Sequence, residues 1–158
     1  TVNYENNINH TTELLNALNE LTEYNIVITM PNADTSGNYI RNKLTIFSHQ
    51  HKNVYLFENM GTINYLSCMK YCEFMLGNTS SGFIEASYFP KKVINIGKRQ
   101  TGRIITPNII NCEIKKEAIL ESIKLLKDLK IPEKIDIYGN GKASDKIIKI
   151  LKNIIKND

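Results

Sequence analysis

Short β-branched segments alternate with segments of helical periodicity along the 158 residues of this chain. Residues 11–21 (TTELLNALNEL) place leucines at 14, 15, 18 and 21, the spacing of one helix face, and the run NIVITM at 25–30 ends before Pro31. The connections are short, and no internal repeat or linker divides the chain. This alternation predicts an α/β fold with a doubly wound, mainly parallel sheet.

The pattern predicts at least five strands with helices between them. Strands are expected at residues 26–30, 54–57, 74–76, 93–96 and 109–112. Helices are expected at residues 11–21, 38–49, 62–71, 115–130 and 142–155, with a short one around 83–89. Residues 1–3 fit the tail of a further strand that begins upstream. We expect residues 1–158 to form a single domain.

The composition is that of a soluble globular protein, with 42% hydrophobic and 23% charged residues. Unbroken apolar runs are only a few residues long, far below the roughly 20 that a membrane span needs, so no membrane association is expected. The chain opens at Thr1 without a basic leader or an apolar export segment. We therefore expect a cytoplasmic protein, cut from a longer sequence.

Positive charge is concentrated in the second half. Residues 1–90 hold 4 basic and 8 acidic side chains, and residues 91–158 hold 16 and 8. A basic half can indicate nucleic-acid binding. Lysines spaced through amphipathic helices, as at 142–156, are more typical of a solvated face, and no DNA- or RNA-binding motif accompanies them. We expect no nucleic-acid partner.

The cysteines are sparse and odd in number, which argues against a disulfide scaffold and favours an intracellular location. Cys68 and Cys72 are four residues apart, on one helix face, and no Cys or His follows at zinc-ligand spacing. Cys112 and the three histidines are scattered. The sequence predicts no metal site.

Ligands of open α/β sheets bind at the carboxyl ends of the strands. Residues 77–82 (GNTSSG) follow one expected strand and lead into a helix, so their hydroxyls and free N–H groups suit an anion, above all phosphate. An equally weighted alternative is that Thr79 or Ser80 merely caps the helix. Glu85 would repel phosphate, so a functional partner would be neutral, such as a ribose diol. Otherwise it is an ordinary first-turn carboxylate.

A second loop, residues 96–103 (IGKRQTGR), carries Arg99 and Arg103, two of only three arginines among 20 basic residues. Arginine in a lysine-rich chain favours planar contact with phosphate or carboxylate, and a solvated loop is the alternative. A third loop, residues 30–37, has turn residues with a polar contact available from Asn32. The glycine fingerprints of NAD and ATP sites are absent from the sequence.

The run GNTSSGFIEASYFPKKVINIGKRQTGR at 77–103 resembles the nucleotide-binding segment of the hydrolysing UDP-N-acetylglucosamine 2-epimerases. MPNAD at 30–34 and YGNGKA at 138–143 are also similar to that family, so the resemblance spans most of the chain. It implies the Rossmann-like C-terminal, UDP-binding half of a two-domain enzyme with a glycosyltransferase-B-like fold. The N-terminal catalytic domain would be absent from residues 1–158, and no cofactor is implied.

The UDP-binding residues implied by the resemblance are Asn32, Met60, Thr79, Ser80, Ser81, Glu85 and Arg99. The three hydroxyl residues would contact the diphosphate, and the glutamate would hold the ribose hydroxyls. The arginine would help to bind the nucleotide, the asparagine would line the site, and the backbone near the methionine would meet uracil. Arg103 matches the family motif without a clear task.

The family's His-Pro-x-Thr motif would end at or just before Thr1, so its histidine is not in this sequence. The family's acidic catalytic residues lie in the N-terminal domain, and we therefore expect no catalytic residue and no turnover in this chain alone. The parent enzyme would eliminate UDP from a UDP-2-acetamido sugar. It would then hydrate the glycal with inversion at C2, giving a free sugar such as N-acetylmannosamine for sialic-acid-type synthesis.

Alternatives remain at this point. A UDP-sugar-dependent glycosyltransferase of the same architecture and a non-catalytic nucleotide-binding module both fit the loops. A non-hydrolysing epimerase would be expected to carry Asp-Ser-Gly-Gly and Arg-x-x-Thr-Glu-Arg-Pro-Glu, and neither is found. The expected partner is UDP or a UDP-N-acetylhexosamine. The sequence leaves the sugar open, and a homo-oligomer of the full-length protein is compatible with it.

Overall fold

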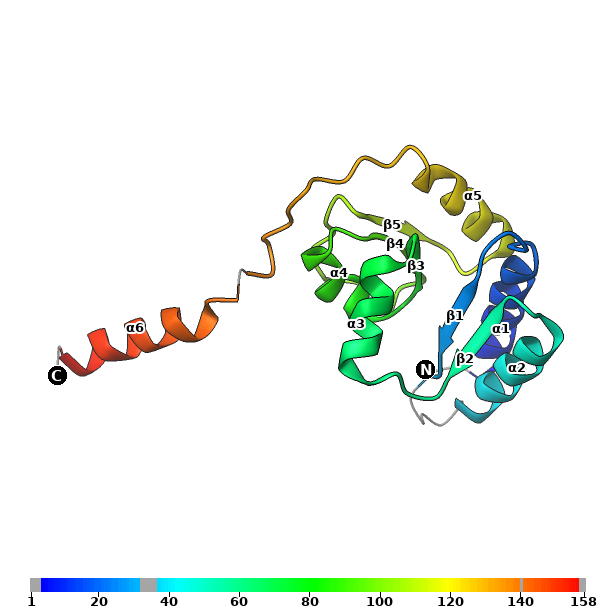
Figure 1. The fold of residues 1–158 in the computed structure, drawn as a ribbon, viewed down its shortest axis with the longest axis horizontal. Coiled ribbons are helices and arrows are strands. Elements are labelled where there is room, and N and C mark those ends of the chain that lie inside the picture. The colour runs from blue at the N-terminus through cyan, green and yellow to red at the C-terminus, as the bar shows by residue number, and fades with distance from the viewer. Residues whose placement is uncertain (1–3, 32–36, 140, 157–158) are drawn as a thin grey trace.

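A computed structural model describes residues 4–31, 37–139 and 141–156 (Figure 1). The strands are β1 (Ile26–Thr29), β2 (Val54–Phe57), β3 (Phe74–Gly77), β4 (Lys92–Ile96) and β5 (Ile109–Cys112). The helices are α1 (Tyr4–Asn19), α2 (Gly37–Gln50), α3 (Gly61–Tyr71), α4 (Glu85–Tyr88), α5 (Lys116–Leu126) and α6 (Ala143–Lys156), with a 3-10 turn, η1 (Ser80–Gly82). The expected α/β class is confirmed.

The strands form two parallel sheets, β1–β2 and β3–β4–β5. Ile26 pairs with Val54 in the first sheet, and Gly77 pairs with Asn95 in the second. The expected single sheet of at least five strands is therefore divided. Within the described residues no strand lies between β1 and β3, and Figure 1 shows the two sheets standing apart.

The strand end expected at residues 1–3 lies outside the described residues, and the placement of the helices leaves a position for such a strand. Helices α1 and α2 pack against each other, and their apolar side chains share one core layer. Crossovers between parallel strands are right-handed, so helices on the same face step in one direction across a sheet. Helix α2 connects β1 to β2. A strand that is connected to β1 through α1 would therefore lie beside β1 at the edge that does not pair with β2. That position is between β1 and β3.

Two apolar layers cover the two faces of the strands. Helices α1, α2 and α5 pack on one face against residues that include Ile94 and Ile96 of β4. Met69 of α3 and the residues around α4 pack on the other face, where Val93 of β4 and Ile109 of β5 are buried. Strand β4 thus contributes to both layers, as expected for a central strand covered by helices on both sides.

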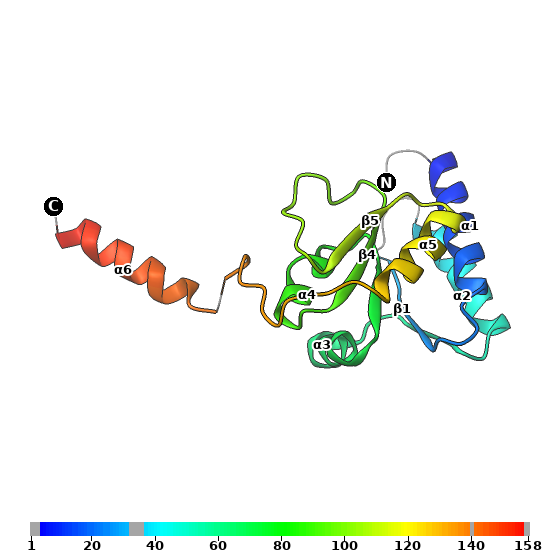
Figure 2. The ribbon, with the colours of Figure 1, turned by 90° about the horizontal axis from the view of Figure 1, so that it is seen from above.

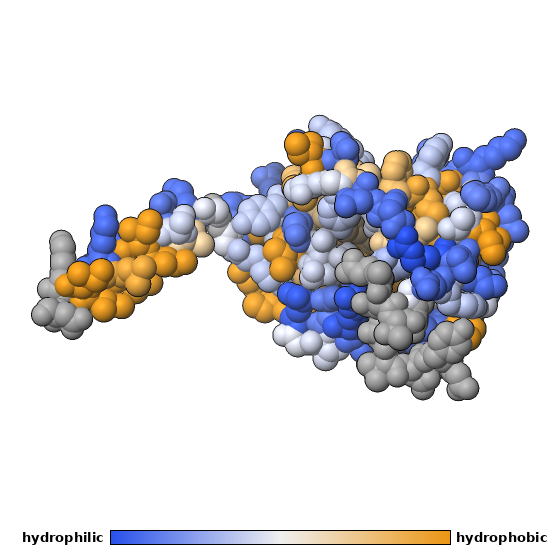
Figure 3. Space-filling model, turned by 90° about the horizontal axis from the view of Figure 1, so that it is seen from below, coloured by the Kyte–Doolittle hydropathy of each residue, from blue (hydrophilic) through white to orange (hydrophobic). Residues whose placement is uncertain are grey.

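Helix α6 stands apart from the body of the molecule (Figures 1 and 2). The segment before it touches the body at Tyr138, whose hydroxyl donates to the carbonyl of Ile104 at 3.3 Å. Lys146, Lys149 and Lys152 of α6 are exposed as expected, but so is the apolar side of the helix, visible as orange in Figure 3. That side consists of Ile147, Ile148, Ile150, Leu151, Ile154 and Ile155. Among the described helices, none is long and apolar enough to cross a membrane.

Candidate functional site

The candidate site is built at the carboxyl ends of the neighbouring strands β3 and β4. The register pairs Gly77, the last residue of β3, with Asn95, the penultimate residue of β4. The loops that follow these strands therefore leave the same edge of the sheet beside each other. One is the hydroxyl turn, residues 78–82, and the other is the arginine loop, residues 97–103.

The hydroxyl turn is a capped 3-10 turn. Thr79 has an extended backbone, and its side-chain oxygen accepts a hydrogen bond from the N–H of Ser81 at 3.3 Å. Thr79 therefore caps this turn, as one of the two interpretations of the sequence expected. The hydroxyls of Ser80 and Ser81 make no hydrogen bond with any described residue. They are available to a ligand.

Close packing against the sheet explains why this turn contains only small residues. Gly82 is buried, and a methyl group added to it would meet a side-chain carbon of Val93 on β4 at 3.0 Å. That separation is shorter than ordinary carbon contacts. The glycine therefore lets the turn lie directly on the sheet.

Glu85 begins α4, three residues after the hydroxyl turn. Its carboxylate oxygen Oε2 is buried and has no hydrogen-bond partner among the described residues. Buried polar atoms are nearly always hydrogen-bonded, so an unpaired one needs an explanation. A carboxylate can only accept hydrogen bonds, and the missing partner must therefore be a donor, such as a hydroxyl group.

In the arginine loop, the two arginines differ in their partners. Arg99 is exposed, and its guanidinium has no hydrogen bond or ion pair within the described part of the chain. Arg103 behaves differently, because its Nε donates to the side chain of Gln100 at 2.6 Å. Gln100 in turn donates to the carbonyl of Asn78 at 2.7 Å and so joins the two loops.

The remaining predicted residues follow the strands of the other sheet in the sequence. Met60 is half-buried and precedes α3 in the segment that follows β2. Asn32 lies outside the described residues. The loops after β1 and β2 are joined by Arg41 of α2, which forms an ion pair with Glu58 and donates to the carbonyl of Pro31 at 3.1 Å. The structure thus places the turn, Glu85 and the arginine loop after the strands of one sheet, and Met60 between β2 of the other sheet and α3.

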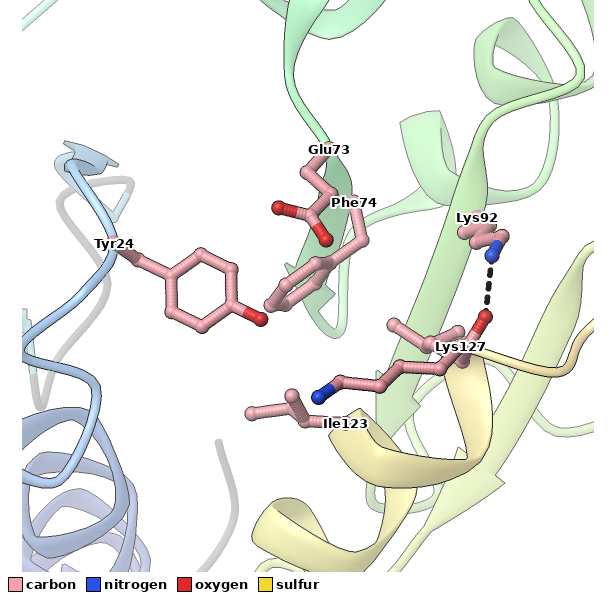
Figure 4. Close-up of a pocket in the computed structure, with 7 residues that line it drawn as sticks. Tyr24, Glu73, Phe74, Lys92, Ile123 and Lys127 are labelled. Carbon is pink, nitrogen blue, oxygen red and sulfur yellow. Dashed lines mark hydrogen bonds between the residues drawn. The ribbon is translucent and has the colours of Figure 1, made fainter.

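A hollow at the opposite end of the strands is unrelated to this site (Figure 4). It is lined by Phe74 and Lys92, the first residues of β3 and β4, and by Tyr24, whose ring meets Phe74 edge-on with ring centres 5.5 Å apart. Lys92 donates to the carbonyl of Leu126. Burial, helped by the Glu73 carboxylate, raises the pKa of the Tyr24 phenol. These groups connect the two sheets and hold helix α5.

The thiol groups are free at all three cysteines. Burial raises the pKa of the Cys72 and Cys112 thiols, which keeps them in their less reactive protonated form. Within the described residues, no three His, Cys, Asp or Glu side chains are grouped to hold a metal ion.

Comparison with known proteins decides the family. The sequence profile of the UDP-N-acetylglucosamine 2-epimerase family matches residues 1–152. The chain belongs to this family. It is 41% identical over 118 residues to a GDP/UDP-N,N'-diacetylbacillosamine 2-epimerase (hydrolyzing) of Campylobacter jejuni, covering 72% of this chain and 30% of the relative. It is 32% identical over 133 residues to a UDP-N,N'-diacetylbacillosamine 2-epimerase (hydrolyzing) of Legionella pneumophila, covering 84% and 35%.

The fold matches part of a solved UDP-GlcNAc 2-epimerase. The structure of the Methanocaldococcus jannaschii enzyme in complex with UDP-GlcNAc and UDP superposes with a TM-score of 0.71 at 16% identity, covering 91% of this chain and 41% of that one. The likeness confirms the Rossmann-like half of a glycosyltransferase-B-like fold. The chain spans about a third of the length of the curated relatives it matches.

Reasoning from the sequence missed one residue of the site. Gln100 lies between the two arginines in the sequence, and in the structure it is 8% exposed and bridges both loops. A glutamine between two arginines in a polar loop gives no periodic pattern. The sequence pointed to Gln100 only through its place in the motif that resembles the family.

Proposed function

We propose that this chain is the UDP-binding, C-terminal domain of a hydrolysing UDP-N-acetylglucosamine 2-epimerase. The observation that carries the proposal is the buried, unpaired carboxylate oxygen of Glu85, close in sequence to a turn with free hydroxyls. A ribose diol supplies the donors that this oxygen lacks. Family membership and relatives named as hydrolyzing 2-epimerases support the same conclusion.

In this function the chain holds the leaving group of the reaction. The hydroxyls of Ser80 and Ser81, the backbone at Thr79 and the Arg99 guanidinium bind the diphosphate. Negative charge grows on it as the bond between sugar C1 and the phosphate oxygen breaks, and donors fixed in advance stabilise that charge. Glu85 accepts hydrogen bonds from the ribose, while Asn32 and the backbone near Met60 contact the rest of the nucleotide.

The proton lost from C2 and the water that then adds are handled by groups outside residues 1–158. The chain alone should therefore bind UDP without turnover. The products of the complete protein would be UDP and a free 2-epimer, such as N-acetylmannosamine from UDP-N-acetylglucosamine. The names of the relatives make UDP-N,N'-diacetylbacillosamine a second substrate to test.

Calorimetry tests the binding half of the proposal. Titration of the chain with UDP, UMP and uridine should give affinity that falls in this order as phosphates are removed. No binding of UDP at millimolar concentration would overturn it. The complete protein should release UDP and a free sugar from UDP-N-acetylglucosamine or from UDP-N,N'-diacetylbacillosamine. Formation of the epimeric UDP-sugar instead would identify a non-hydrolysing enzyme.

A further inference from the structure

Gln100 connects the two loops of the candidate site through its side-chain amide. Its Nε2 donates to the carbonyl oxygen of Asn78 at 2.7 Å, and its Oε1 accepts from Nε of Arg103 at 2.6 Å. A carbonyl can only accept and an arginine Nε can only donate, so a single orientation of the amide satisfies both partners. The side chain is buried, which shields both hydrogen bonds from water.

The hydrogen bond from Gln100 to the carbonyl of Asn78 also fixes the direction of the next backbone N–H. The carbonyl of Asn78 and the N–H of Thr79 belong to the same peptide group, which is planar and trans, so the N–H points away from the carbonyl. The N–H of Thr79 makes no hydrogen bond with any described residue. A carbonyl held by Gln100 therefore directs a free N–H donor to the opposite side of the turn.

The same residue fixes the base of Arg99. The loop folds tightly around it, because Thr101 N–H donates to the carbonyl of Lys98 at 3.1 Å and Arg103 N–H donates to that of Gln100 at 3.2 Å. Arg99 lies within the first of these turns, directly before Gln100 in sequence. Its Cα is thus about 3.8 Å from that of a residue anchored to the hydroxyl turn.

We propose that Gln100 is a positioning residue for the diphosphate, and that Arg103 holds Gln100 rather than the ligand. Gln100 sets the peptide plane that aims the Thr79 N–H, and it keeps the Arg99 backbone at a fixed distance from that donor. Arg103 orients the amide through its Nε. This assignment rests on the proposed UDP site and gives Arg103 the task that the motif alone did not reveal.

The test uses calorimetry on the chain with UDP, inorganic pyrophosphate and uridine. Gln100→Leu keeps the approximate volume but removes both hydrogen bonds, and it should weaken UDP and pyrophosphate about tenfold each, the value of one lost hydrogen bond to a charged group. Uridine affinity should not change, whereas general loosening of the site would weaken all three ligands. Gln50→Leu, at the exposed end of α2, is the matched control and should change none.

Two further variants show whether Arg103 acts through Gln100 or contacts UDP itself. Arg103→Ala should weaken UDP less than Gln100→Leu, and the double variant should match Gln100→Leu, because both act through one amide. Additive losses would show that Arg103 contacts UDP itself and would overturn its assignment. Unchanged UDP and pyrophosphate affinity in Gln100→Leu would overturn the positioning role. If the unmodified chain binds no UDP, the proposed function fails first.

Discussion

Replacing Glu85 by alanine should change stability and affinity in opposite directions. The buried Oε2 has no partner among the described residues, and such a group costs about 1–3 kcal/mol. A first-turn carboxylate returns about 0.3–1 kcal/mol through the helix dipole. The net effect of Glu85→Ala on the ligand-free chain is a gain of about 1 kcal/mol, which corresponds to a Tm increase of about 2–4 °C in a chain of this length.

The same substitution should weaken UDP binding at least about tenfold, because each lost hydrogen bond from the ribose to the carboxylate contributes about 1.5 kcal/mol or more. Thermal unfolding and calorimetry measure the two effects on the same sample. Glu117, an exposed acidic residue in the first turn of α5, gives the matched control. Glu117→Ala should lower stability slightly and leave UDP affinity unchanged. A Glu85→Ala variant with lower Tm and normal affinity would refute a ligand role.

Three further predictions concern other parts of the molecule. Arg99→Ala should weaken UDP by about 10- to 150-fold through loss of a charge-assisted hydrogen bond and leave uridine binding intact in calorimetry; equal loss for both ligands would contradict a phosphate contact. Gly82→Ala should lower the free energy of unfolding by about 1 kcal/mol in urea, since the new methyl group would crowd Val93 at 3.0 Å, and an unchanged midpoint would show that the turn can move. Because burial raises the pKa of the Cys72 and Cys112 thiols, the unfolded state ionises first as pH rises past about 8.5, so stability should fall between pH 7.5 and 9.5. Urea unfolding at both pH values should show this loss, and replacing both cysteines by alanine should remove it.

Local patterns predicted the elements of the fold well. All five expected strands are present to within a residue or two, because β-branched runs between turn residues have few alternative structures. Helix boundaries were less accurate. Helix α1 begins at Tyr4 although its apolar pattern is clear only from residue 11, and α5 ends at Leu126 rather than continuing to 130. Helix ends depend on capping and tertiary contacts that periodicity does not contain.

The candidate site could be predicted from the sequence at the level of loops. The position of the hydroxyl turn and the arginine loop followed from the rule that ligands bind at the carboxyl ends of parallel strands. The different hydrogen bonding of Arg99 and Arg103 did not follow, because the two side chains are identical and only the contact with Gln100 distinguishes them. Likewise, the sequence left the cap and ligand roles of Thr79 as alternatives, and in the structure its hydroxyl caps while its N–H stays free.

Because the strands form two sheets, a bound nucleotide is expected to stabilise the fold differently from a smaller ligand. The residues proposed for diphosphate and ribose follow β3 and β4, whereas Met60 follows β2 in the other sheet. The sheets share one apolar layer, but their inner edges are not hydrogen-bonded to each other. A nucleotide that contacts both sets of loops would link the two sheets across this gap, and pyrophosphate would bind to one sheet alone. UDP should therefore protect amides of β1 and β2 from hydrogen exchange, whereas pyrophosphate should protect only the loops after β3 and β4. Equal protection by both ligands would mean that the shared apolar layer already couples the sheets rigidly.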